Sequence, residues 1–568
     1  MDNGAVVEMR TPEPEVTPVG GSAGRRGWWR LNFIGLGVAL LAVALALTPS
    51  LLPRPWVFEG LVAGIAGAIG YGIGVLVSWV LRKPGLPEPS TGAKGTAWWV
   101  LAVVGVLLFV AAIVAGGMAQ NSVRELVGEP VIPARHIVGI GAVTAGVGFV
   151  LILAARSVRR LTRWVTGHLG RFIPARIAGS LAVVLVLLLG YWVAAGALFN
   201  TFIAGADAIY AAKNAGTPEG VTPPTSPTRS GSPGSLVSWE SLGYEGRAFV
   251  GRGPSGEQIE GFAGEPAVEP IRVFVGVDSA SSAQERAAVA VAELERTGAF
   301  ERSVLVVAGA TGTGWLEAQS VDSIEYMWGG DTAIASIQYS VLPSWISFLV
   351  DVDRASEAGR ALFEAVYATW STLPADSRPK LIPYGLSMGS FAAQASFGGV
   401  QDLAARTDGA LFVGTPNFSE PWSGLTAGRD PGSLEWQPVY QQGATARWAA
   451  AEGDLARPGG PWPGPRVVFM QHASDPVVWW SFDLMSRRPD WLTEPRGPDV
   501  SPNTTWLPII TFLQVTVDQF FGVNVPPGHG HNYINTIAYA WANVVAPPDW
   551  TDEKSARLQA LIDGDPLE

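Results

Sequence analysis

Long uninterrupted apolar stretches dominate the first third of this chain. They cover approximately residues 31–48, 56–81, 97–118, 136–155 and 177–203. A helix of roughly 20 residues crosses the hydrocarbon core of a bilayer, which is about 30 Å thick, and each stretch is close to that length or longer. The pattern therefore predicts five transmembrane helices within residues 28–210, and the polar residues 1–27 before them are typical of a flexible tail.

The pattern changes after residue 210. Residues 211–238 are rich in Pro, Ser, Thr and Gly and predict a linker. Beyond it, short apolar runs alternate with segments of helical periodicity. We expect strands at residues 271–277, 303–310, 333–339, 410–414 and 466–471, a further strand that ends just before Ser387, and helices at residues 282–297 and 355–372. This alternation predicts an α/β domain with a mostly parallel sheet over residues 239–568.

Inside the apolar stretches the sequence offers little chemistry. No Asp, Glu, Lys or Arg lies in the middle of a stretch, which argues against an ion pathway. Gly60 and Gly64, and likewise Gly70 and Gly74, have the spacing that lets membrane helices approach closely. We therefore expect these stretches to pack against one another as helices.

Basic residues give the membrane helices a direction. Thirteen Lys and Arg residues lie before the first stretch or in the connections after the second and fourth, whereas the other side has only Arg54, Arg124 and Arg135. Positively charged connections stay in the cytoplasm. The N-terminus is therefore expected in the cytoplasm, and five crossings place everything after residue 203 outside the cytoplasmic membrane.

Composition removes several classes of function. Residues 212–568 carry 22 basic and 40 acidic residues without a basic cluster, which argues against nucleic acid as a partner. The chain contains no cysteine, so disulfides, a thiolate nucleophile and cysteine-ligated metals are excluded.

A candidate nucleophile lies in the segment Gly385-Leu386-Ser387-Met388-Gly389. A G-x-S-x-G between a strand and a helix is typical of a sharp turn that exposes the serine hydroxyl, and the glycines leave room where strand and helix nearly touch. The alternative is a serine in an ordinary strand-to-helix turn. Pro383 counts against the nucleophile, because proline cannot donate to a sheet ladder and the strand before such a turn is normally central.

Two further segments downstream supply an acid and a base. Asp475 lies in a loop just after the expected strand at residues 466–471, where it would orient a histidine or merely begin an Asp-Pro turn. His529 and His531 lie in a glycine-rich loop before a helix-like segment. They could also bind a metal, but no clear third ligand lies nearby, so we expect neither a metal nor another cofactor.

The order Ser387, Asp475, His529 or His531 resembles the order of the catalytic residues in the α/β-hydrolase superfamily. Together with the apolar stretches, the segments 311–315 (TGTGW) and 528–533 (GHGHNY) resemble actinobacterial membrane-bound α/β-hydrolases with an N-terminal multi-span region. The resemblance implies a helical transmembrane bundle followed by an α/β-hydrolase fold.

Acyl transfer assigns a role to each candidate. Ser387 would be the nucleophile, Asp475 would orient the base, and His531 is preferred as that base because Gly530-His531-x-Tyr533 matches the usual Gly-His-x-aromatic pattern. His529 remains the alternative.

An oxyanion hole needs two backbone donors, which we expect to be Met388 and one of Ala310, Thr311 and Thr313. The same glycine-rich segment could instead cradle a phosphate, but no lysine follows the glycines, which argues against a P-loop.

Three segments could shape the substrate site. Residues 416–465 are rich in Gly, Pro and Trp and form either a lid or a coil packed on the core. Residues 506–523 form an amphipathic helix on the membrane or a core helix. Trp479 and Trp480 line an acyl pocket or fill the core.

The sequence thus predicts a membrane-anchored, extracytoplasmic serine hydrolase, an esterase or lipase-like enzyme, that contacts the lipid bilayer and acts on a lipid or acylated envelope ester. Two alternatives stay open: an acyltransferase with the same residues, and a catalytically silent membrane scaffold or transport accessory.

Overall fold

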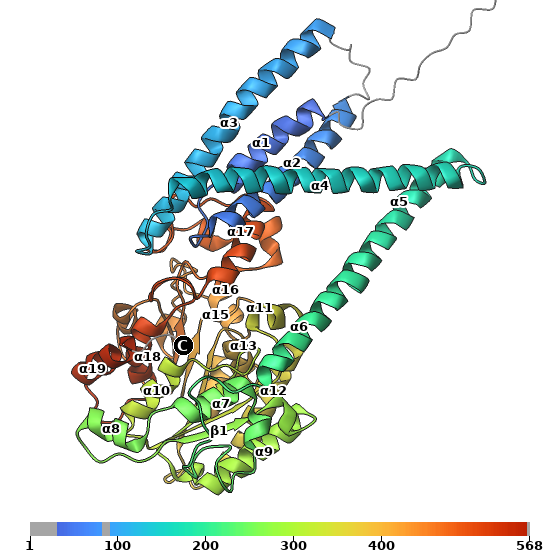
Figure 1. Ribbon diagram of the computed structural model, residues 1–568. Helices are drawn as coiled ribbons and strands as arrows, with labels where there is room; N and C mark the ends of the chain where they lie inside the picture. Colours follow the sequence, from blue (N-terminus) through green and yellow to red (C-terminus); the bar gives the residue numbers. More distant parts are fainter. Residues whose placement is uncertain (1–30, 82–90, 565–568) are drawn as a thin grey trace, which may run out of the picture.

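The apolar stretches form helices, of which the first four lie together on one side of an α/β domain, whereas the last runs from the end of the fourth back to that domain (Figure 1). The computed structural model describes residues 31–81 and 91–564, so the expected tail at residues 1–27 and the basic residues Arg82 and Lys83 lie outside the described part. The helices are α1 (Phe33–Ala46), α2 (Trp56–Leu81), α3 (Thr91–Leu126), α4 (Ala134–Leu169) and α5 (Ala175–Tyr191), which continues through the π-helical turn η1 (Trp192–Leu198) into α6 (Phe199–Asn214).

Four of these helical segments are long and apolar enough to cross a membrane: Trp56–Leu81, Gly95–Leu126, Ala134–Leu169 and Ala175–Asn214. The first expected span differs, because α1 has only 14 residues, about 21 Å at 1.5 Å per residue. Its ends have local causes. The side chain of Asn32 accepts a hydrogen bond from the N–H of Gly35 and caps the start of the helix, and Pro49 follows shortly after its end.

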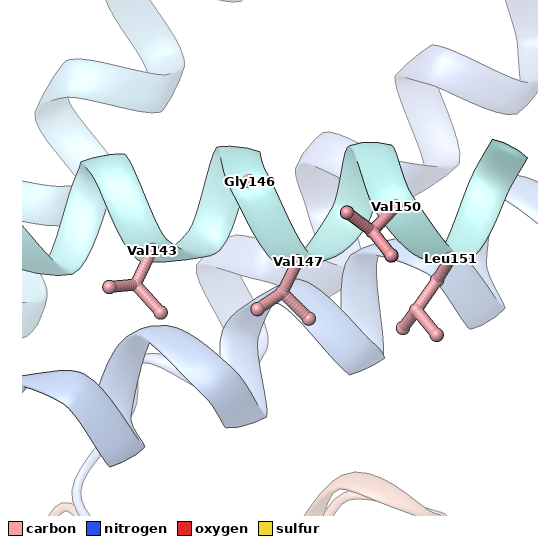
Figure 2. A pocket seen from close by; sticks show the side chains of 5 residues that line it. All are labelled: Val143, Gly146, Val147, Val150 and Leu151. Atoms are coloured by element: carbon pink, nitrogen blue, oxygen red, sulfur yellow. The ribbon is translucent and has the colours of Figure 1, made fainter.

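Glycines set the close packing of α2 on its neighbours. A Cβ built on Gly60 would lie 2.7 Å from Cβ of Val143 in α4, and one on Gly64 would lie 2.7 Å from Cβ of Val147. Figure 2 shows these two valines on α4, one turn apart. Gly74 likewise faces α1, so the expected close approach at the spaced glycines is confirmed.

The α/β domain is built on a seven-stranded, wholly parallel sheet with the order β1-β3-β2-β4-β5-β7-β6. The strands are β1 (Ile271–Val275), β2 (Val304–Gly309), β3 (Thr332–Ile337), β4 (Lys380–Leu386), β5 (Gly409–Val413), β6 (Ala446–Ala449) and β7 (Arg466–Met470). Six of them occupy the expected places, and the predicted fold class is confirmed. Two groups of helices cover the sheet: α9 (Ala283–Thr297), α12 (Val352–Trp370) and α13 (Met388–Gln394) in one, and α10 (Ala318–Met327), α18 (Ile537–Val545) and α19 (Asp552–Asp563) in the other.

Strand β6 was not predicted. It lies inside residues 416–465, which also contain the short helix α15 (Trp422–Ala427), and it pairs with β7 at the edge of the sheet. Trp422 and Trp448 are almost fully buried. This segment is therefore packed on the core, and its four-residue strand depends on pairing with β7 because so short a run carries no clear pattern of its own.

Pro383 lies in the central strand β4 without breaking the sheet. The N–H of Leu381 donates to Asp408 Oδ2 on the side of β5, at 2.9 Å. Because amides alternate between the two sides of a strand, the nitrogen of Pro383 also faces β5. The pairing of β4 with β5 begins one residue later, at Tyr384 and Leu411. The proline thus occupies a position just before that ladder, which removes the objection that the sequence raised.

Residues 506–523 contain helix α17 (Ile510–Asp518), which lies between the α/β domain and the N-terminal helices (Figure 1). Its apolar residues, including Ile510 and Leu513, join a cluster with residues of α1, α2 and α4. Gln514 donates to the carbonyls of Ala46 and Thr48, at 3.1 and 2.9 Å, and so satisfies the C-terminal end of α1. The helix is buried as expected of a core helix, but it packs against the N-terminal helices.

The connection between α1 and α2 is buried where α17 packs against the N-terminal helices. Arg54 lies between Glu59 of α2 and Asp518 of α17, with N–O distances of 2.7 and 3.6 Å, and the three side chains are fully buried. Ser50 also donates to Asp518. Leu51 and Leu52 belong to the hydrophobic core of the α/β domain. The two parts of the chain therefore share a core and do not merely adjoin.

The Pro- and Ser-rich segment after α6 lies against the α/β domain. Arg229 donates to the carbonyls of Val250, Gly253 and Pro254 at 2.7–3.1 Å. The N–H of Ser230 donates to the carbonyl of Arg272 in β1 at 3.0 Å. These bonds hold the chain beside the sheet although its composition forms no helix or strand there.

Candidate active site

Ser387 lies at a strained turn between β4 and α13. Its backbone has φ 56° and ψ −128°, a conformation that L-residues rarely adopt and that persists only where the surroundings impose it. A Cβ on Gly385 would overlap the carbonyl of Gly389, and one on Gly389 would overlap that of Gly309 at the end of β2. The two glycines of the motif are thus required by contact, and they let α13 start directly against the sheet.

Asp475 and His531 form a buried pair. Asp475 follows β7 and caps helix α16 (Pro476–Trp479), where its Oδ1 accepts from the N–H of Val477 at 2.8 Å. Its Oδ2 lies 2.6 Å from Nδ1 of His531. Asp475 is fully buried and His531 nearly so. Because Nδ1 is held by the carboxylate, the other ring nitrogen, Nε2, is left for a proton transfer, and it has no hydrogen-bond partner among the described residues.

The His531 ring and the Ser387 turn meet at the end of β5. The N–H of Ser387 donates to the carbonyl of Val413 at 2.9 Å. The next residue, Gly414, has φ +53°, and a Cβ built on it would lie 2.7 Å from Nδ1 of His531. The imidazole of His531 therefore packs on Gly414, and the preceding residue, Val413, holds the backbone of Ser387. This brings the three predicted residues Ser387, Asp475 and His531 to one edge of the sheet.

Two aromatic side chains that sequence reasoning did not assign support this pair. The hydroxyl of Tyr533 donates to Asp475 Oδ2 at 2.6 Å and accepts from the N–H of His472 at 3.1 Å. The His472 ring is stacked on Tyr533, with centroids 4.1 Å apart, and its Nδ1 lies 2.9 Å from the carbonyl of Gly530. Burial and the neighbouring Asp475 carboxylate raise the pKa of Tyr533 well above its usual value, so the hydroxyl keeps its proton for this bond. The only sequence signal was the aromatic residue two places after His531.

His529 occupies a different environment. It belongs to a turn in which the N–H of Asn532 donates to its carbonyl at 3.1 Å, and its Nδ1 has no partner among the described residues. Asp475 therefore contacts His531 and not His529. Within residues 31–81 and 91–564, no group of three or more His, Asp or Glu side chains is placed to hold a metal ion.

The expected oxyanion donors lie close to Ser387. Met388 is the first residue of α13, and the first amides of a helix have no acceptor within the helix. Ala310 follows β2, where a Cβ on Gly389 would lie 3.3 Å from its carbonyl carbon. The N–H of Thr311 already donates to the carbonyl of Trp315 at 3.1 Å. This favours Ala310 over Thr311 as the second donor.

A buried carboxyl group, Glu317, was missed by sequence reasoning. It lies directly before α10 and is only 4% exposed, and its Oε2 has no hydrogen-bond partner among the described residues. Burial raises the pKa of Glu317 to about 7, although the nearby His531 works in the opposite direction. A carboxyl that still carries its proton in about half of the molecules at pH 7 thus lies close to the imidazole. No spacing motif in the sequence indicates it.

The two tryptophans after Asp475 have different places. Trp479 fills the core, where its Nε1 donates to the carbonyl of His472 at 3.2 Å. Trp480 donates to Thr516 of α17 at 2.8 Å and lies edge-on to Phe348, with ring centroids 5.2 Å apart. Only Trp480 therefore belongs to the aromatic surroundings of the site.

A parallel sheet with a strained serine turn after its central strand, and with an acid and a histidine at the same edge, is the architecture of an α/β-hydrolase. The family model described as Alpha/beta-hydrolase family matches residues 271–558, and the model described as Alpha/beta-hydrolase family N-terminus matches residues 47–254. The chain belongs to this family. No curated protein and no solved structure matches it.

Proposed function

We propose that this chain is a membrane-anchored serine hydrolase that cleaves an ester of a lipid or of another acylated envelope component. The observation that carries the proposal is the contact between Asp475 and His531 beside the strained turn of Ser387. The carboxylate fixes the imidazole with Nδ1 inward, which leaves Nε2 to take the proton from the serine hydroxyl.

The reaction follows from this arrangement. Ser387 Oγ attacks the ester carbonyl while His531 Nε2 accepts its proton, and the N–H groups of Met388 and Ala310 stabilise the oxyanion. His531 then gives the proton to the leaving alcohol, which leaves an acyl-enzyme at Ser387. Water, activated by the same imidazole, releases the acid. Every step uses groups of the chain itself and needs no cofactor.

We further propose that the α/β domain lies outside the cytoplasmic membrane. The ends of α1 and α3 and the starts of α2 and α4 lie on the side of the α/β domain (Figure 1). Arg156, Arg159, Arg160 and Arg163 lie in the second half of α4, and Arg171 follows its end. That end of α4 points away from α17 (Figure 1). The proposal requires that the 14-residue helix α1 crosses the membrane together with the four longer helices, and that the N-terminus lies on the side with more basic residues, as the sequence predicts.

The test uses the full chain in detergent, because Leu51 and Leu52 are part of the core of the α/β domain. A fluorophosphonate probe should label the parent protein and the exposed-serine control Ser377→Ala equally, and should not label Ser387→Ala. Equal labelling of Ser387→Ala, or no labelling of the folded parent, would refute the proposal.

A further inference from the structure

The exposed large apolar side chains of the α/β domain gather around the candidate site. Six of them define what we call the apolar rim: Trp345, Leu349, Phe418, Phe482, Met485 and Phe520. On the rest of the described α/β domain such side chains stand singly, as at Leu236, Val268 and Leu561. Isolated exposed apolar residues are ordinary, whereas a cluster marks a contact surface.

The sheet topology places the rim at the same edge of the sheet as the candidate site. Helix α11 (Ser344–Val350) follows β3, Phe418 follows β5 and the 3-10 helix η7 (Phe482–Met485) follows β7. All strands are parallel, so these segments leave the same edge of the sheet as the turn of Ser387. Phe520 lies in the 3-10 helix η9 (Gln519–Phe521), which leads into the histidine loop.

Aromatic rings connect the rim with the serine. Phe391 lies one helical turn after Ser387 in α13, and its ring centroid is 5.3 Å from that of Phe418. Phe418 contacts Phe348 at 5.1 Å, and Phe348 contacts Trp480 at 5.2 Å. An acyl chain can lie along this continuous aromatic surface, from the rim to the carbonyl carbon that Ser387 attacks.

The rim is also continuous with the last membrane helix. Trp345 lies between Phe520 and Phe202 of α6, with ring centroids 5.4 and 6.2 Å away. Residues 177–206 contain no charged side chain. As a helix they measure about 45 Å, which exceeds the hydrocarbon thickness of about 30 Å. The apolar surface of this helix therefore extends past the hydrocarbon core as far as the rim.

We propose that the rim touches the bilayer and that the acyl chain of the substrate reaches Ser387 over it, directly from the membrane. The occupant is thus a lipid acyl chain. Arg487 and Arg488 follow the rim residue Met485 and are exposed, which places positive charge at the level where an apolar surface that enters a membrane meets lipid headgroups. This inference rests on the proposed hydrolase activity.

The test compares two substrates with the full chain reconstituted in phosphatidylcholine vesicles: a long-chain acyl ester dissolved in the vesicle membrane, and a water-soluble acetate ester. The rim variant is Leu349→Ser with Met485→Ser, whose side chains are 57% and 37% exposed. The matched control is Leu236→Ser with Leu561→Ser, at 58% and 36%.

The rim variant should lose about tenfold or more of its activity on the membrane ester, because the two lost apolar contacts together are worth about 1.4 kcal/mol or more. It should keep its activity on the acetate ester and its labelling by the fluorophosphonate, which also demonstrates that it is folded. The control should behave as the parent. Equal loss of activity on the membrane ester in both variants would overturn the proposal. Conversion of a dimer to a monomer by the rim substitutions would also overturn it, because the rim would then be a contact between copies of the chain. Failure of the hydrolase itself would appear instead as an unlabelled parent.

Discussion

Leu52, in the connection between α1 and α2, lies against Gly530, the residue between the two candidate histidines. A Cβ built on Gly530 would lie 3.2 Å from Leu52 Cδ1, and Leu52 is fully buried. Gly530 is held in turn by the hydroxyl of Ser474, which accepts from its N–H at 2.8 Å. The N-terminal helical region thus forms part of the wall behind the histidine loop and contributes directly to the structure of the candidate site.

Leu52→Ala should therefore lower both stability and activity. Truncating a buried leucine costs about 2–5 kcal/mol, and the cavity would loosen the loop that carries His531. Thermal unfolding in detergent and hydrolysis of an acetate ester measure the two effects. Leu41→Ala, at a leucine of α1 that is 58% exposed, is the control. Equal melting temperatures and equal rates of ester hydrolysis in the two variants would show that Leu52 does not support the histidine loop.

The two histidines should differ sharply. His531→Ala removes the imidazole that is hydrogen-bonded to Asp475, and we expect labelling of Ser387 to slow by roughly 10²–10⁴-fold, the usual contribution of a general base. His529→Ala should slow it by less than about tenfold. The rate of fluorophosphonate labelling at pH 7.5 measures both. The opposite order would make His529 the base.

Glu317 should leave a signature in the pH dependence of stability. Its pKa is about 7 in the folded protein, against an ordinary 4.5, so between these values the folded chain holds a proton that the unfolded chain has released. Its contribution to stability is therefore complete below pH 4.5 and is lost as the pH rises to about 7.

Glu317→Gln removes this titration. The free energy of unfolding of the variant minus that of the parent should rise by up to about 3 kcal/mol when the pH is raised from 5 to 7.5. Melting temperatures at the two pH values check this, with the exposed Glu295→Gln as control. A difference between variant and parent that does not change with pH would mean that Glu317 is ionised in the folded protein.

The absence of cysteine makes the topology directly testable. Ser371→Cys places a single thiol on the exposed end of α12, and Gly167→Cys places one near the basic end of α4, where no atom lies within 4 Å of the new Cβ. In intact spheroplasts, an impermeant maleimide should label the first variant and should label the second only after permeabilisation. The reverse pattern would place the α/β domain in the cytoplasm.

The sequence by itself determined the features that depend on local pattern. Apolar runs, period and turn residues located the long helices, six of the seven strands and the turn of Ser387, because the glycines at Gly385 and Gly389 are needed wherever a strand and a helix touch. The length of α1 was overestimated, because the apolar composition continues past both ends of the helix, which are set by the cap at Asn32 and by Pro49. The short strand β6 escaped notice for the opposite reason, since its pairing partner and not its composition makes it a strand.

Only the tertiary structure decided the contacts between distant residues. His529 and His531 share one loop and one composition, and which ring meets Asp475 depends on how a chain segment 56 residues away returns to the sheet. The pattern around His531 marked Tyr533 only as an aromatic residue and not its hydrogen bond to Asp475, and the buried Glu317 and the burial of Leu52 behind the histidine loop have no local signal at all. Burial and electrostatics are properties of surfaces brought together by folding, and the order of residues along the chain does not contain them in readable form.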